Sequence, residues 1–201
     1  MSKILKAMAF AVAVSAGGAG AAQAEEGLYY GAALGLAKSE SESAGIGMTE
    51  GNDMTFGVVL GYRMEYASGT SVAIEGTYDG TSRNLMTSVG VPTDACTDWS
   101  PDWCEVHTIA RIRGVYGTTL SNGIEVLSMA GIASVAGLAE DGPGNYVDTT
   151  ATGFTLGVGG QKPVGNGMLR VELVYDRFEG SEPGDYEKNL DILSLRTVFT
   201  F

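Results

Sequence analysis

Large apolar side chains recur at every second position through most of the chain. In one stretch Met54, Phe56 and Val58 alternate with Thr55 and Gly57. A period of two residues is typical of β-strands that have one apolar face and one polar or small-residue face. The pattern predicts an all-β fold with eight strands, at residues 27–38, 53–64, 70–80, 105–117, 123–137, 150–162, 167–179 and 190–201.

The predicted strands are long, with 11–15 residues each. Strands of soluble proteins average about 5–6 residues, whereas a tilted strand needs about 9–11 residues to cross a bilayer. The fifth strand breaks the pattern, because Leu127 and Met129 share a parity with Glu125. We therefore expect a β-bulge within that strand.

Short and long connections alternate strictly between these strands. The short ones, of 4–5 residues, are 65–69, 118–122 and 163–166, and the long ones, of 10–24 residues, are 39–52, 81–104, 138–149 and 180–189. Outer-membrane barrels have short periplasmic turns and long extracellular loops. The sequence thus predicts an eight-stranded antiparallel up-and-down transmembrane β-barrel, with both termini on the periplasmic side.

Charged residues fall on the strand face opposite the large apolar residues. A basic side chain that faces lipid at the bilayer midplane costs about 2–4 kcal/mol, so these residues are expected inside the lumen, which eight strands leave just wide enough for side chains. Glycines on the same face leave room for them. The predicted network, which plugs the lumen, has five bases and five acids: Arg63, Glu75, Asp79, Arg111, Arg113, Glu125, Arg170, Glu172, Asp176 and Arg196.

Residues 1–24 differ from the rest of the chain. Lys3 and Lys6 precede a short apolar run, and Ala22-Gln23-Ala24 forms a small-residue cleavage site. These features predict a cleaved secretory signal peptide, followed by a barrel at 25–201. A transmembrane anchor is the alternative, but glycines interrupt the apolar run and it is too short.

The formal net charge of −12 becomes −14 once the two lysines of the signal peptide are removed. An acid excess argues against nucleic acid as a partner. Twelve acids fall in the four long connections, which form either a solvated surface or a site where Ca²⁺ or Mg²⁺ bridges to lipopolysaccharide phosphates. They are Glu40, Glu42, Glu50, Asp94, Asp98, Asp102, Glu140, Asp141, Asp148, Glu182, Asp185 and Glu187.

The longest connection contains Cys96 and Cys104, and an exported protein meets conditions in which these two can form a disulfide. Trp99 and Trp103 lie between them. Exposed tryptophans on a cross-linked loop are candidates for a binding hot spot. They can equally pack within the loop or rest against lipid.

His107 is the only histidine in the chain. By its parity it faces inward near the outer rim, close to Asp79. A histidine at a barrel rim permits a lipid A-modifying hydrolase, but no serine lies at a matching spacing. We interpret His107 as a non-catalytic residue and expect neither catalytic nor cofactor-binding residues.

The chain ends on alternating residues, Leu195-Arg196-Thr197-Val198-Phe199-Thr200-Phe201. In this alternating ending, and in the strand and loop pattern described above, residues 25–201 resemble the small outer-membrane β-barrel family of Gram-negative bacteria. This family includes the OmpA transmembrane domain, OmpX and the opacity-type surface antigens. The resemblance implies that Phe199 and Phe201 form an assembly signal for the barrel-assembly machinery. It also implies periplasmic chaperones during biogenesis, contact with outer-membrane lipids and lipopolysaccharide, and a monomer.

The sequence therefore favours a non-enzymatic, structural outer-membrane barrel whose acidic loops are exposed at the surface and adhesive toward a host or the environment. The alternatives are a small porin-like channel, the lipid A-modifying enzyme that would use His107, and a soluble lipocalin-like binder. The last would have to turn its charged face outward.

Overall fold

Nine β-strands and no helix are found in the part of the chain that the computed structural model describes, residues 26–43, 47–66, 69–85, 87–88, 103–140, 146–179 and 189–201. Within these ranges no helix is long and apolar enough to cross a membrane. The strands are β1 (Gly27–Ser43), β2 (Gly47–Tyr66), β3 (Thr70–Leu85), β4 (Thr87–Ser88), β5 (Trp103–Thr119), β6 (Glu125–Glu140), β7 (Tyr146–Val164), β8 (Gly167–Glu179) and β9 (Asn189–Thr200).

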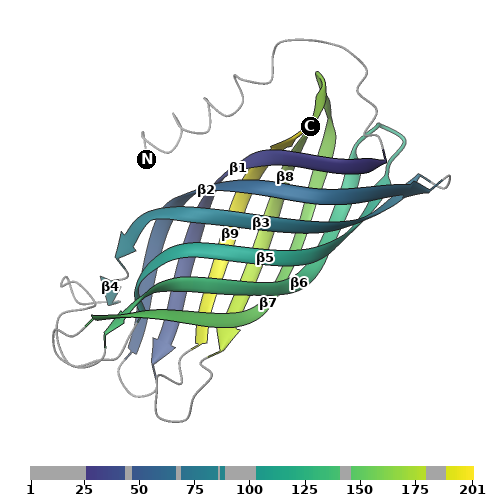
Figure 1. Cartoon of the computed structure of the whole chain (residues 1–201). Coiled ribbons are helices and arrows are strands. Elements are labelled where there is room, and N and C mark those ends of the chain that lie inside the picture. Colours follow the sequence, from purple (N-terminus) through teal and green to yellow (C-terminus); the bar gives the residue numbers. More distant parts are fainter. Residues whose placement is uncertain are drawn as a thin grey trace.

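Eight long strands form one closed antiparallel sheet (Figure 1). Each pairs with the next long strand along the chain, and β9 pairs back onto β1. The two-residue β4 lies outside this ring and pairs with β2 at Thr49 and Glu50. The predicted eight-stranded antiparallel up-and-down barrel is confirmed.

The strands are strongly tilted, as Figure 1 shows. Starting at Gly61 of β2 and following directly opposed residues once around the barrel leads back to β2 at Gly51, ten residues away. A stagger of this size in an eight-stranded barrel corresponds to a tilt of about 40°. The barrel is therefore narrow, and side chains fill its interior.

The barrel has two distinct ends. We call the end that carries both Gly27 and Phe201 and the connections after β2, β5 and β7 the turn end, and the opposite end the loop end. The strands continue toward the loop end further than predicted: β1 runs to Ser43 instead of residue 38, and β2 begins at Gly47 instead of residue 53. The predicted loop boundaries were wrong there, because both strand faces are polar and the alternation that marks a strand disappears.

Five of the acids assigned to loops consequently lie in paired strands. Glu40 is opposed to Glu50, and Glu42 to Met48, in the β1–β2 ladder. Glu140 ends β6 and Asp148 lies in β7. The acidic surface thus begins on the barrel wall itself.

The bulge predicted within residues 123–137 is also absent. The register of β6 with β7 is unbroken from Glu125 to Glu140. Leu127 and Met129 share the parity of Glu125 because all three point into the lumen, where the two apolar residues pack with Ala73 and Val115. The irregularities lie instead in β5, between Trp103 and Thr108, and in β3, between Gly80 and Asn84.

An apolar belt surrounds the outside of the barrel. Its side chains alternate with inward residues and stay well exposed, as at Val58 (61%), Ile74 (63%) and Ile132 (60%). Exposed aromatic residues lie toward both of its borders, where aromatic rings favour a membrane–water interface. They are Tyr30, Tyr62, Tyr116 and Phe201 toward the turn end, and Phe56, Tyr78 and Phe154 toward the loop end.

Candidate functional site

The centre of the lumen holds a ring of two acids and two bases from three strands. Arg113 Nη2 of β5 lies 2.6 Å from Glu75 Oε1 and 2.9 Å from Glu172 Oε2. Arg170 of β8 contacts the same two carboxylates, with Nη2 2.7 Å from Glu75 Oε2 and Nε 3.1 Å from Glu172 Oε2. All four side chains are almost fully buried, so each charge depends on these partners.

A branch extends from this ring toward the loop end. Arg196 joins Glu172 to Asp79, with its Nη2 2.8 Å from Asp79 Oδ1. Arg111 in turn binds Asp79 and donates from Nε to Asp176 Oδ1 at 2.9 Å. The eight residues of ring and branch, which we call the charge network, contain four bases and four acids and are therefore neutral as a set.

Two kinds of contact build the charge network. Glu75 and Arg113, like Glu172 and Arg196, are directly opposed on neighbouring strands, so the strand register alone brings them together. The contact between Arg170 of β8 and Glu75 of β3 instead joins strands that do not pair. Contacts of this second kind cross the lumen and hold its opposite walls together.

Arg63 and Glu125 form a separate pair nearer the turn end. Arg63 Nη2 lies 2.8 Å from Glu125 Oε2, which also accepts a 2.8 Å hydrogen bond from Gln161. Ser71 donates to the other oxygen of this carboxylate, and Glu65 contacts Arg63. The ten charged residues that the sequence predicts to form one network therefore divide into the charge network of eight residues and the pair of Arg63 and Glu125.

Glycine makes room for the buried charges. A Cβ on Gly57 would lie 1.8 Å from Asp79 Oδ1, and one on Gly61 would lie 2.3 Å from the ring of Tyr29. The hydroxyl of Tyr29 in turn donates to Glu75 Oε2 at 2.8 Å. Inward glycines thus permit the close approach of the side chains that line the lumen.

Sequence reasoning missed a second feature of the lumen. Apolar side chains from β1, β5, β6, β8 and β9 form a buried cluster between the charge network and the loop end, which we call the loop-end apolar layer. Most of them lie on the inward parity, which was expected to carry charged residues and glycine. The layer comprises Ala37, Val106, Ile109, Ala133, Val135, Phe178, Leu190 and Ile192.

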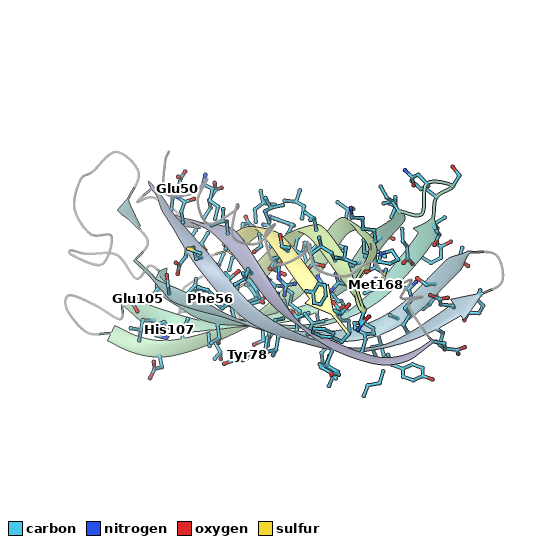
Figure 2. All side chains as sticks on the ribbon, turned by 90° about the horizontal axis from the view of Figure 1, so that it is seen from above. Glu50, Phe56, Tyr78, Glu105, His107 and Met168 are labelled. Carbon is cyan, nitrogen blue, oxygen red and sulfur yellow. The ribbon has the colours of Figure 1, made fainter. Side chains whose placement is uncertain are left out.

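His107 does not lie where parity predicts. The β5 register shifts between Val106 and Thr108, and Val106 takes the buried inward position instead. His107 Nε2 lies 2.8 Å from Glu105 Oε2, while Asp79 binds Arg111 and Arg196. Figure 2 shows His107 and Glu105 toward the same end of the barrel as Glu50. The predicted inward orientation beside Asp79 was wrong, because the bulge reverses the parity of this segment.

Several predicted features lie outside the described residues. These include residues 1–24 together with Cys96 and Trp99, and the side chains of Trp103 and Cys104 are not described either. The signal peptide, the disulfide and the tryptophan hot spot therefore stay predictions. Among the residues that are described, no three His, Cys, Asp or Glu side chains are grouped to hold a metal ion.

A basic residue offsets like charges on the outer wall beyond the apolar belt. Glu40 and Glu50 are directly opposed, and Lys38 contacts both, with Nζ 3.4 Å from Glu50 Oε2. The hydrogen bond to Glu40 raises the pKa of Lys38 above its ordinary value. The acidic wall at the loop end is thus partly neutralised by its own lysine.

The predicted assembly residues lie at the seam where β9 meets β1. Phe201 and Tyr30 exchange backbone hydrogen bonds, from Phe201 N to Tyr30 O at 2.8 Å and in return at 3.3 Å. The ring of Phe201 packs against Tyr30 at 6.0 Å and Phe199 at 4.8 Å between centroids. The chain end therefore helps to close the barrel, and its recognition by assembly machinery stays a prediction.

Comparisons with known proteins agree with this architecture. Residues 7–189 match the family described as outer membrane protein beta-barrel domain. Neisserial surface protein A is 14% identical, with 87% of this chain and 98% of that chain covered and a TM-score of 0.55. Ail, the attachment invasion locus protein of Yersinia pestis, is 15% identical, with 88% of this chain and 100% of the Ail chain covered and a TM-score of 0.47. No curated protein sequence matches the chain.

Proposed function

The chain belongs to the outer membrane protein β-barrel family, and from that premise we propose that it is a non-enzymatic structural protein of the outer membrane with a surface role. The family implies the outer membrane of a Gram-negative bacterium. The apolar belt supports a lipid environment, since its side chains would otherwise face water. The observation that carries the structural role is the closed lumen, because the charge network fills it with buried side chains.

We propose that the loop end faces the outside of the cell and the turn end faces the periplasm. The support is the family pattern of short periplasmic turns and long outer loops. An epitope tag inserted at Asn122, in a short turn, can be compared with one inserted within residues 180–188. On intact cells the second tag should bind antibody, and the first should do so only after the membrane is permeabilised. Labelling of the Asn122 tag on intact cells would contradict this orientation.

An adhesive role is the finer part of the proposal. The name of the Neisserial protein describes it as a surface protein, and we extend a surface location to the loops of this chain. Trp99 and Trp103 are the residues proposed to bind a host or environmental surface. Replacing both by alanine should reduce attachment of cells to that surface while the amount of folded barrel stays constant. Unchanged attachment would remove the tryptophans from the proposal.

Catalysis by His107 is the weaker alternative. In the described residues its ring bonds to Glu105 and to no hydroxyl nucleophile. A hydrolase needs a nucleophile within hydrogen-bond reach of its base. We therefore expect His107→Ala to leave the lipid A profile of the cell unchanged, and a changed profile in mass spectra of extracted lipid A would restore the enzyme hypothesis.

A further inference from the structure

The loop-end apolar layer lies further along the same strands as the charge network. On β5, Ile109 comes two residues after Arg111 in the direction of the loop end, and on β8, Phe178 comes two residues after Asp176. Side chains of a strand alternate, so each of these pairs lies on the same inward face in adjacent levels. The two levels are stacked along the lumen.

The apolar layer is as tightly closed as the charge network. Phe178, Leu190 and Ile192 have no exposed surface, and Val106 and Ile109 are 1% exposed. Ala151 of β7 packs against the cluster as well, so six of the eight barrel strands contribute to it. The layer therefore extends around most of the lumen wall, with β2 and β3 contributing none of its members.

The two levels would exclude ions for different reasons. The charge network blocks the lumen by filling it, and its charges are already paired. The apolar layer has no group that could replace the water around an ion, and hydrophobic constrictions close channels by losing water. The two levels share no side chain, although they adjoin where Ile109 is opposed to Asp79 and Ile192 to Asp176.

We propose that the lumen carries two closures in series, the charge network and the loop-end apolar layer, and that either one alone keeps the barrel non-conducting. The inference is independent of the adhesive role. It also separates the barrel from a porin, because opening a path requires two independent changes at different levels of the lumen.

The test compares variants of the full barrel in planar lipid bilayers. Glu75→Ala with Arg113→Met opens the central ring of the charge network and keeps the network balanced, since Glu172 retains Arg170 and Arg196, and Asp79 retains Arg111. Phe178→Ala with Leu190→Ala opens the apolar layer. Each pair alone should give no more channel openings than the unchanged protein, and the four changes together should raise the opening rate on the order of tenfold or more.

The control replaces the lipid-facing Leu193 and Leu195 by alanine, which removes similar volume outside the lumen. Heat-dependent gel mobility verifies folding, and if the fourfold variant does not fold, Phe178→Leu with Leu190→Val replaces the alanine pair. Conductance from either pair alone would overturn the proposal, since the remaining closure would then not suffice to block ions. A folded fourfold variant without openings would overturn it too.

Discussion

Removing one charged side chain from the network should lower the free energy of unfolding far more than removing two side chains of opposite charge together. Arg196 is 1% exposed and contacts Glu172 and Asp79, itself 2% exposed. Arg196→Met leaves four buried acids against three bases, and Asp79→Ala leaves three buried acids against four bases. Breaking a buried pair by removing one partner costs about 3–5 kcal/mol, because an uncompensated charge remains. Each single variant should lose that much free energy of unfolding.

The double variant restores the balance with three bases and three acids. If the two effects were independent, the double variant would lose about 6–10 kcal/mol. We expect the double variant to lose less than about 3 kcal/mol of unfolding free energy, because it leaves only a loss of packing volume and no unpaired charge. The assay is reversible urea unfolding in lipid vesicles, followed by circular dichroism. Additive losses, or single variants as stable as the unchanged protein, would refute the view that these charges act as one balanced set.

Two further predictions concern the two faces of β2. Gly57→Ala should lower the free energy of unfolding by about 1–3 kcal/mol, since its Cβ would lie 1.8 Å from Asp79 Oδ1. Gly76→Ala is the control, because the atom nearest to its Cβ would be 3.8 Å away, and it should lose no stability in the same urea assay. Val58→Arg, in the apolar belt, should lower the free energy of unfolding by about 2–4 kcal/mol. Asn52→Arg lies on the same face six residues nearer the loop end and should lower it by only about 0–1 kcal/mol. Equal costs at the two arginine positions would show that the belt does not face lipid.

The sequence alone predicts the barrel, because seven of the eight predicted strands alternate cleanly and because short and long connections alternate strictly between them. It also predicts which charges point inward, since a strand has only two faces. Alternation does not show which of these charges meet across the lumen. The contact of Arg170 with Glu75 depends on the stagger of the closed barrel, which no single strand reveals.

Three features could not be read from alternation. The strand ends at the loop end are polar on both faces, so Glu40 and Glu50 look like loop residues. The bulge in β5 changes the parity of His107 by one residue, and no glycine or proline within residues 102–113 marks it. The loop-end apolar layer was missed because residues such as Phe178 share the charged parity and were not expected in a polar lumen.

The most direct test of the account is the electrophoretic behaviour of the protein from fractionated cells. A closed barrel with a lipid-facing belt resists detergent until it is heated. The account predicts that the protein is found in the outer-membrane fraction and that its gel mobility changes between unheated and boiled samples. Recovery in the soluble periplasmic fraction, or a mobility that heating does not change, would contradict it.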